Sequence, residues 1–311
     1  MTDAARRSAA SKLPARIAFL GFGLIGGSLA LALREAGSTT RLAAWTPDGT
    51  GPAEGVRRRL LDVAPATAAE ALDGAGLVVL AGPPLAILSA LEELAGTLNG
   101  ALSAGVTITD VASTKAVIAA TAEDLGLPFV GGHPMAGRET TGVGSATADL
   151  FLDRPWVIVV AEGTDARHVE RVEALATAAG ARPARMEAID HDLAVAAISH
   201  LPLIASAALV ESVAADAERW PVARRLAASG WRDVTRLARG DPDMGAGIIA
   251  TNARPIAGYL RAYRDALDAW LAELDEMTDE SQPVVPGPER VAGLKTRLVA
   301  ARATLEQEPG A

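Results

Sequence analysis

The chain has 311 residues, of which 50% are hydrophobic and 22% charged, a length that allows two domains of ordinary size. Its formal net charge of −9 argues against a surface for nucleic acids or anionic membranes, which are themselves negatively charged. The absence of cysteine excludes disulfides, thiolate metal sites and cysteine nucleophiles, and with 4 histidines a histidine-rich metal site is not expected. The composition predicts a soluble, cytoplasmic globular protein.

An apolar segment at 17–33 follows a basic N-terminal stretch and resembles a secretory signal. It contains glycine at positions 21, 23, 26 and 27, and no small-residue cleavage site clearly follows it. It is also shorter than the roughly 20 residues that a membrane-spanning helix requires. We therefore predict a buried strand, a tight turn and the start of a helix, preceded by a disordered tail at 1–14.

Short apolar segments alternate with helical stretches through the first half of the chain. The apolar segments predict strands buried on both faces of a parallel sheet, at 16–21, 41–46, 77–82, 106–110, 128–131, 156–161 and 182–187. Ala/Leu-rich stretches between them predict helices at 27–36, 84–95, 115–125 and 165–179. This alternation is typical of a doubly wound α/β domain, which we predict over 15–187.

From about residue 188 onward the apolar period is helical. We predict helices at 191–214, 222–239, 255–277 and 291–305, with a linker at 278–288. Pro255 suits the first position of a helix, where its missing N–H costs little. The second predicted domain, 188–311, is therefore all-helical, and an apolar helical half of this kind often forms a homodimer.

A glycine pattern follows the first predicted strand. Gly21, Gly23 and Gly26 fit G-x-G-x-x-G where the strand turns into a helix. In such a turn the first glycine permits the bend and the second lets the backbone approach a pyrophosphate. The third allows close packing of helix on strand. In this context the pattern predicts a dinucleotide site, whereas alone it would indicate only a tight turn.

The end of the second predicted strand bears on which dinucleotide is bound. NAD preference usually requires an acidic residue there to hold the ribose 2′-hydroxyl, but Thr46 occupies this place and Asp48 follows a proline. A hydroxyl tolerates a 2′-phosphate better than a carboxylate does. The arginines at 57–59 are candidates for that phosphate, although a solvated helix face is the simpler interpretation. The choice between NAD and NADP stays open, and these residues favour NADP.

Two polar stretches follow neighbouring predicted strands, DVASTK at 110–115 and GGHPMAG at 131–137. Ligands of such sheets lie outside the carboxyl ends of the strands. His133 is a candidate general base, because the unperturbed pKa of histidine is about 6.5. The alternative is that His133 is a structural loop residue hydrogen-bonded to the backbone, but Gly-Gly-His-Pro offers little core against which its ring could pack. Lys115 is a candidate for a bond to a cofactor hydroxyl or for an ion pair with an acid.

Together these stretches resemble the prephenate/arogenate dehydrogenase family of tyrosine biosynthesis. The matching segments occur in the order of the family: GFGLIGGSLALAL (21–33), LVVLAGPP (77–84), DVASTK (110–115), GGHPMAGRETTG (131–142), ADLF (148–151), HDLAVAAISHLP (191–202), GWRDVTRLARGDP (230–242) and TN (251–252). The resemblance implies a Rossmann domain, a helical domain that forms the dimer, and an active site between the two.

The reaction that the resemblance implies is oxidative decarboxylation of a cyclohexadienol, with hydride transfer from C4 to a nicotinamide and loss of CO2. Because aromatisation drives the step, the protein mainly orients two reactants and accepts one proton. By resemblance His133 is the base or a hydrogen-bond acceptor, and Ser113 holds the hydroxyl and nicotinamide in register. Arg236 would bind a substrate carboxylate, with Asp233 on the same helical face to orient it.

Further site residues follow from the same resemblance. Those expected at the cofactor are Gly21, Gly23, Leu24, Ile25, Gly26, Thr46, Gly82, Pro83 and Ser113, and those expected at the substrate, besides Arg236, are Arg138, Glu139, Ser199 and Leu203. His191 and His200 are expected to be helix residues satisfied by backbone or by Asp190 and Asp192, rather than catalytic groups.

Two positions depart from the family pattern. Arg138-Glu139 stands where the family commonly has Thr-Glu, which adds a cation near the mouth of the site. Leu203 ends SHLPL where many members have SHLPH, and it shares a helical face with Ser199. A histidine would present a polar group to the substrate side chain and leucine cannot. We therefore hypothesise a preference relaxed or shifted toward arogenate, whose side chain carries an amino group.

Other functions fit parts of the pattern. These are a dehydrogenase of an amino-substituted prephenate in specialised metabolism, a β-hydroxyacid or imine reductase, and a nucleotide sensor without catalysis. Reductases of that class typically use a lysine of the second domain, where this chain has only Lys295. The joint presence of His133, Ser113 and Arg236 argues against a sensor. The 34 residues after Met277 are too few for a regulatory domain, so inhibition by tyrosine would have to act at the active site.

Overall fold

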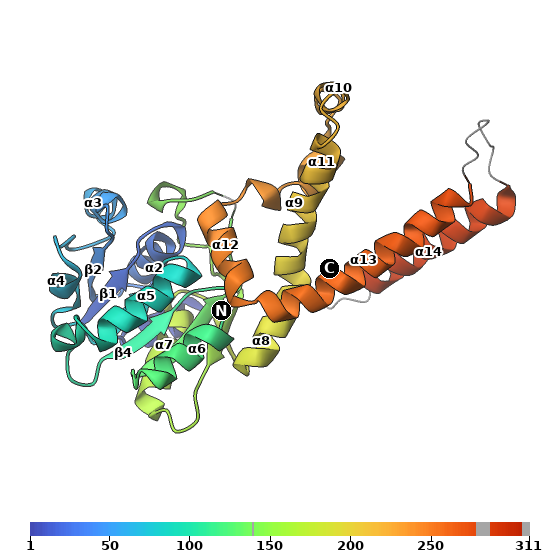
Figure 1. Cartoon of the computed structure of the whole chain (residues 1–311). Helices are drawn as coiled ribbons and strands as arrows, with labels where there is room; N and C mark the ends of the chain where they lie inside the picture. Colours follow the sequence, from blue (N-terminus) through green and yellow to red (C-terminus); the bar gives the residue numbers. More distant parts are fainter. Residues whose placement is uncertain (139, 278–286, 307–311) are drawn as a thin grey trace. The chain divides into compact units, whose positions relative to one another are not determined.

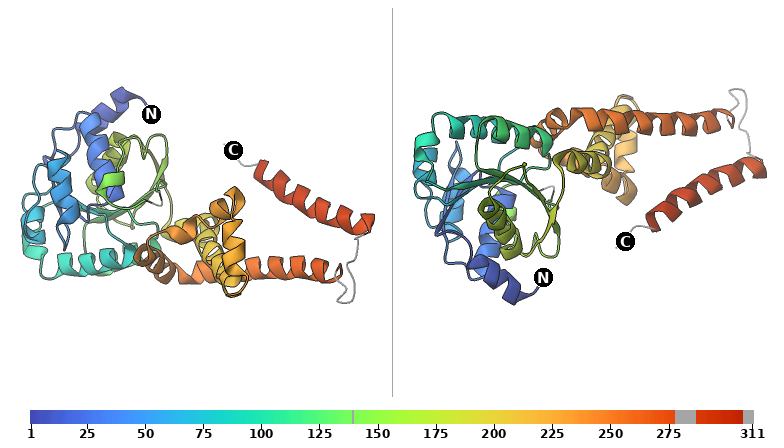
Figure 2. Two further views of the ribbon diagram at one scale, coloured as in Figure 1. Left: turned by 90° about the horizontal axis from the view of Figure 1, so that it is seen from above. Right: turned by 90° about the horizontal axis from the view of Figure 1, so that it is seen from below.

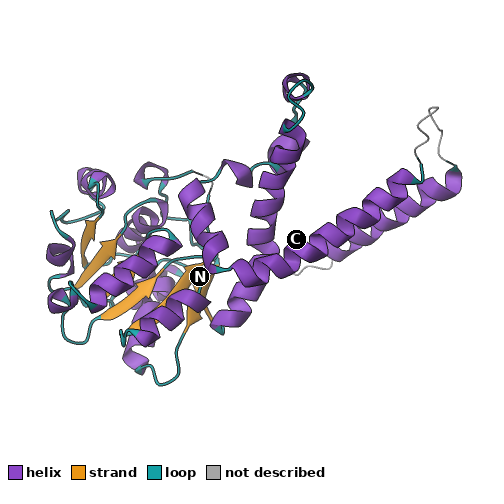
Figure 3. Cartoon of the chain, in the orientation of Figure 1, coloured by secondary structure: helices purple, strands orange, loops and turns teal. Residues whose placement is uncertain are grey.

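The computed structural model describes residues 1–138, 140–277 and 287–306, and the chain forms two compact units, 1–259 and 260–311 (Figure 1). The first unit contains a seven-stranded sheet in the order β2-β1-β3-β4-β5-β6-β7 (Figure 3). Its strands are β1 (Arg16–Leu20), β2 (Arg41–Trp45), β3 (Leu77–Leu80), β4 (Thr107–Asp110), β5 (Phe129–Pro134), β6 (Pro155–Val159) and β7 (Arg182–Arg185). Each predicted strand is present.

The sheet is parallel from β2 to β5, but β6 runs antiparallel to β5 and β7 pairs parallel with β6. The wholly parallel sheet that we predicted is therefore wrong at one pair. The segment between β5 and β6 has only the short 3₁₀ helix Val143–Ser145 among its described residues, so no crossover helix returns the chain for a parallel pairing.

Helices cover both faces of the sheet because successive strand residues point to opposite sides (Figure 2). Phe19 of β1 packs in one apolar cluster with Leu29 and Val172, whereas Leu20 packs in the other with Ile87. The first cluster lies under α1 (Asp3–Ala10), α2 (Leu24–Glu35) and α7 (Ala166–Ala178), and the second under α4 (Ala68–Leu72), α5 (Pro84–Ala95) and α6 (Ala116–Asp124). A further helix, α3 (Thr50–Arg57), follows β2. The predicted doubly wound α/β class is confirmed.

The prediction of a disordered tail at 1–14 is wrong, because residues 3–10 form α1. The Thr2 hydroxyl accepts the Ala5 N–H at the start of this helix, and Arg6 donates to the carbonyl oxygens of Ala32 and Ala178. The buried residues of α1 are two alanines, so the helix contributes no large apolar side chain to the core.

The chain beyond β7 is helical, as predicted. Its elements are α8 (Ala188–Val195), a π-helical turn (Ala196–His200), α9 (Leu201–Ala214), α10 (Trp220–Arg225), α11 (Ser229–Val234), a 3₁₀ turn (Leu237–Arg239), α12 (Pro242–Thr251), α13 (Ala253–Asp275) and α14 (Pro288–Glu306). The single helix predicted over 222–239 is wrong, because Ala228 adopts an extended conformation (φ −110°, ψ −162°) and α11 ends at Val234. The boundary predicted between residues 187 and 188 stays a prediction.

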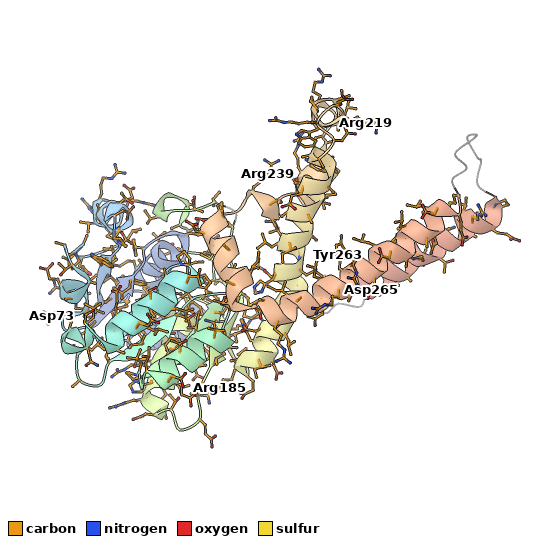
Figure 4. All side chains as sticks on the ribbon, in the orientation of Figure 1. Asp73, Arg185, Arg219, Arg239, Tyr263 and Asp265 are labelled. Atoms are coloured by element: carbon orange, nitrogen blue, oxygen red, sulfur yellow. The ribbon has the colours of Figure 1, made fainter. Side chains whose placement is uncertain are left out.

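In the second unit, Arg297 of α14 binds Glu273 of α13 at 2.7 Å and lies over the Trp270 ring. Tyr263 and Leu267 are among the exposed apolar residues of α13, and Figure 4 labels Tyr263. Within the described ranges, one helical stretch, Ala188–Ala214, has the length and composition of a membrane span. That is weak evidence, because helices of soluble proteins pass the same test.

Candidate active site

A cleft of about 1240 Å³ opens in the first unit at the carboxyl ends of the parallel strands. The loops after β1, β2, β3, β4 and β5 form one wall, and residues of α8, the π-helical turn, α9, the 3₁₀ turn and α12 form another. Ligand sites of doubly wound sheets occupy this place. The volume exceeds that of an ordinary single-ligand pocket, so it can accommodate a dinucleotide together with a small substrate.

The glycine loop fits a pyrophosphate. Gly21 has φ +96°, and a Cβ there would lie 2.6 Å from the carbonyl carbon of Ala81, so only glycine is accommodated. Gly23 precedes the first residue of α2, and a Cβ on it would meet nothing within 4 Å. The N-terminus of α2 has no side-chain cap and no acidic residue in its first turn, which leaves its N–H groups available to an anion.

Gly26, the third glycine of the pattern, does not line the cleft. It is buried in α2, where a Cβ would lie 3.2 Å from the Phe22 ring and 3.3 Å from the Gly21 carbonyl oxygen. It therefore allows close packing, as its position in the pattern predicts, rather than contact with a cofactor.

A carboxylate, that of Asp48, lies shortly after the end of β2. Asp48 lines the cleft, and it accepts hydrogen bonds from the hydroxyls of Thr46 at 2.9 Å and Thr50 at 2.6 Å. These two bonds, with that of Thr50 the stronger, lower the pKa of Asp48, so its side chain is ionised at neutral pH.

The three arginines proposed for a 2′-phosphate have other contacts. Arg57 binds Glu54, and Arg58 donates to the Val143 carbonyl oxygen. Although residues 57–59 all belong to the described part of the chain, none of them lines the cleft.

A buried ion pair lies beneath the cleft. Lys115 and Asp110 are both fully buried, and the ammonium of Lys115 binds Oδ2 of Asp110. The same carboxylate accepts the N–H groups of Ala112 and Gly132, each at 3.0 Å. Of the two roles considered for Lys115, the structure shows the ion pair, with Asp110 as the partner. Burial lowers the pKa of Lys115, and the charge of Asp110 opposes this change.

His133 lies on β5, lines the cleft and is 9% exposed. Its pKa lies well below 6.5, mainly because burial disfavours the charged imidazolium, and then because of the positive charge of Lys115 and unfavourable electrostatic interactions with His191 and His200. His133 is therefore neutral at physiological pH, which is the protonation state that a general base requires.

A hydrogen-bonded chain runs from His133 to a carboxylate on α8. Nδ1 of His133 lies 2.8 Å from Nε2 of His191, with the rings nearly perpendicular at 84°, and Nδ1 of His191 lies 2.8 Å from Oδ1 of Asp192. The contact of His191 with Asp192 agrees with the expectation for it. Its contact with His133 was not predicted, because the two histidines lie on separate elements.

Asp192 also caps a neighbouring helix. Its Oδ1 accepts the N–H of Lys115 at 2.7 Å and its Oδ2 accepts the N–H of Ala116 at 2.8 Å, at the N-terminus of α6. A carboxylate is favourable at that end of a helix. The side chain thus joins α8 to the loop that contains Ser113.

The cleft brings together nearly all of the other predicted site residues. Those that line it are Gly21, Gly23, Leu24, Ile25, Thr46, Gly82, Pro83, Ser113, Arg138, Ser199, Leu203 and Arg236. Glu139 lies outside the described residues. α11 ends at Val234, between Asp233 and Arg236, and the Arg236 N–H donates to the Asp233 carbonyl oxygen at 3.5 Å. The orienting role expected for Asp233 stays a prediction.

Sequence reasoning missed two parts of the site. One is α12, whose Met244, Gly245 and Ile248 line the cleft, and whose start could have been found from the Asp-Pro pair at 241–242, since Asp241 caps it. The other is Asn252, which joins elements by donating to the Asp192 carbonyl oxygen at 2.8 Å and contacting Nδ1 of His200 at 3.0 Å. A single asparagine in a helical region gives no sequence signal of a role in joining elements.

Comparisons with known proteins agree with this geometry. A model of the prephenate dehydrogenase nucleotide-binding domain matches residues 29–184, and one of the prephenate dehydrogenase dimerization domain matches residues 187–282. The prephenate dehydrogenase of Bacillus subtilis is 32% identical over 265 residues, which cover 84% of this chain and 68% of that protein.

Solved structures are similar as well. The arogenate dehydrogenase of Synechocystis superposes with a TM-score of 0.70 at 32% identity, covering 93% of this chain and 99% of the other. The prephenate dehydrogenase of Aquifex aeolicus, in complex with hydroxyphenyl propionate and NAD⁺, has the same fold with a TM-score of 0.78 at 23% identity, covering 93% and 98%. By sequence, fold and the arrangement of its cleft, this chain belongs to the prephenate dehydrogenase family of oxidoreductases.

Proposed function

We propose that this protein catalyses the NAD-dependent oxidative decarboxylation of prephenate or arogenate in tyrosine biosynthesis. The observation that carries the proposal is the position of His133. A neutral, buried imidazole lines the same cleft as the open glycine loop and Arg236. Family membership supports the same reaction.

The residues of the cleft divide the chemistry between them. When bound, the nicotinamide cofactor supplies the hydride acceptor. His133 accepts the proton of the C4 hydroxyl, and Ser113 donates a hydrogen bond that holds this oxygen. Loss of the proton favours departure of hydride from C4, and the ring carboxylate then leaves as CO2 as the ring becomes aromatic. Arg236 binds a substrate carboxylate with its planar guanidinium.

The test is turnover of the purified protein with NAD⁺ and either substrate, followed by the absorbance of reduced nicotinamide and by identification of the product. We expect 4-hydroxyphenylpyruvate from prephenate or tyrosine from arogenate. If neither substrate is consumed with either cofactor, the proposed function is wrong.

We further propose NAD as the preferred cofactor, in place of the NADP that the sequence favoured. The ionised carboxylate of Asp48, held by Thr46 and Thr50, would repel a 2′-phosphate and suits a ribose hydroxyl. The absence of Arg57–Arg59 from the described lining of the cleft supports the same choice. A higher kcat/KM with NADP⁺ than with NAD⁺ would contradict it.

For the substrate, we propose a preference relaxed or shifted toward arogenate. Leu203 lines the cleft with Met244 and Ile248, so this part of the wall is apolar. Leu203 itself offers no group that would distinguish a keto acid by a hydrogen bond. The measurement is kcat/KM for the two substrates under one set of conditions, and a clear preference for prephenate would refute the shift.

We also propose a homodimer in the cytoplasm, with nucleotide binding by 15–187 and dimerisation by 188–311. The dimerization-domain match and the exposed apolar side chains of α13, among them Tyr263, Leu267 and Leu271, support the dimer. Sedimentation equilibrium tests it, since a monomer at micromolar concentration would contradict the proposal.

A further inference from the structure

When His191 is in its neutral form, the hydrogen-bonded chain behind His133 has one consistent placement of its protons. The Asp192 side chain accepts two backbone N–H groups of α6, and it acts as a hydrogen-bond acceptor toward His191 as well. The ring proton of a neutral His191 therefore lies on Nδ1, which donates to Asp192. Nε2 of His191 is then an acceptor.

The proton in the bond between the two rings consequently belongs to His133. Nδ1 of His133 donates to Nε2 of His191 over 2.8 Å, and Nε2 of His133 keeps its lone pair. Because Nδ1 is engaged behind the wall, Nε2 is the nitrogen left for the cleft that His133 lines. The opposite tautomer would present an N–H to the substrate and could not accept its proton.

The surroundings make this arrangement rigid. His191 and Asp192 are buried, with 1% and 2% of their surfaces exposed. Asp192 is held from two sides, by the N-terminus of α6 and by Asn252, which donates to its backbone carbonyl oxygen. A buried, fully bonded network of this kind fixes side-chain orientation.

From this geometry we propose that His191 and Asp192 are positioning residues that set the tautomer and orientation of His133 for proton acceptance. The inference rests on the proposed function, in which His133 is the base. Neither residue lines the cleft. Their effect passes through one ring nitrogen of His133.

Kinetics of two variants at one position test the role of His191. H191F removes the acceptor but keeps a planar ring, whereas H191Q retains an amide oxygen close to the place of Nε2. We expect kcat to fall about 10- to 100-fold in H191F, with substrate KM and NAD⁺ affinity nearly unchanged, as for other groups that orient a catalytic residue. H191Q should recover most of the loss.

A matched pair on α8 tests the carboxylate. D192N weakens the acceptor of His191 and should lower kcat, while D190N makes the same change at an exposed neighbour and should leave kcat unchanged. Thermal unfolding of each variant separates loss of fold from loss of positioning. Equal kcat in D192N and D190N would overturn the role of Asp192.

Histidine ¹⁵N NMR tests the tautomer without any substrate or cofactor. The chain has 4 histidines, so H133N suffices to assign the His133 signals. We expect the Nδ1–H tautomer in the wild type and in D190N, and its loss or mixing in H191F. If H191F retains both wild-type kcat and this tautomer, the positioning role is wrong and the proposed function stands. If the wild type shows no turnover, the proposed function fails, and the NMR result still decides the tautomer.

Discussion

The ammonium of Lys115 and the carboxylate of Asp110 form an ion pair with no exposed surface on either side chain. The pair has two effects. It ties the end of β4 to β5 through the Gly132 N–H, and the positive charge of Lys115 helps to keep the nearby His133 neutral. The chain contains two other lysines, Lys12 and Lys295, and both are on the surface.

Removal of one partner of this pair is expected to destabilise the protein strongly. K115M leaves Asp110 as an uncompensated buried charge, so the free energy of unfolding should fall by about 3–5 kcal/mol in chemical denaturation. The control K12M changes an exposed lysine and should have little effect. The double variant K115M/D110N should recover part of the loss. Equal stability of K115M and K12M would show that the pair is not ionised.

Replacement of the proposed base should affect the rate and not the cofactor. H133N is expected to lower kcat by about 10²–10⁴-fold, since general base catalysis contributes on that order, while NAD⁺ affinity by calorimetry stays nearly unchanged. H168N is the control, because His168 is buried against Thr107 and does not line the cleft. A comparable loss of kcat in folded H168N would contradict the assignment.

Acid should inactivate the enzyme only well below pH 6.5. The active form has neutral His133, and its pKa is lowered, so the base stays competent as pH falls through 6.5 and is lost only near its lower pKa. The acidic limb of kcat/KM should therefore lie below the value for a solvent-exposed histidine. A limb centred at or above pH 6.5 would mean that His133 is not the titrating group.

Asp48 is expected to select against NADP. In D48S the carboxylate no longer repels a 2′-phosphate, so kcat/KM with NADP⁺ should rise about tenfold, equivalent to about 1.4 kcal/mol. The value with NAD⁺ should fall, because a ribose acceptor is lost. D73S is the matched control, since Asp73 is exposed and lies outside the lining of the cleft (Figure 4). An unchanged NAD/NADP ratio in D48S would exclude this role.

Arg236 is expected to act in binding. R236A should raise substrate KM by about 10- to 100-fold, the range of a lost charge-assisted hydrogen bond, with a smaller change in kcat. R239A removes an exposed arginine of the adjacent 3₁₀ turn that does not line the cleft, and should behave as wild type (Figure 4). If the two variants raise KM equally, the carboxylate is bound elsewhere.

The sequence predicted what depends on local pattern. Short apolar segments identified the strands, and motifs at strand ends led to Ser113 and His133 in one cleft. The antiparallel β6 was missed because apolar runs do not encode strand direction. Helix α1 was missed because its buried residues are two alanines, Ala9 and Ala10. The partnership of His133 with His191 was missed because 58 positions separate them, and only the fold brings the rings together.

One carboxylate connects two separate requirements of the reaction. Asp192 supports the imidazole chain through Oδ1 and holds the first turn of α6 through both oxygens, directly after the loop with Ser113. In the proposed reaction the proton acceptor and the hydroxyl donor meet at a single substrate oxygen. Because Asp192 contacts both the His191 ring and the N-terminus of α6, its displacement would disturb the support of His133 and of the Ser113 loop together.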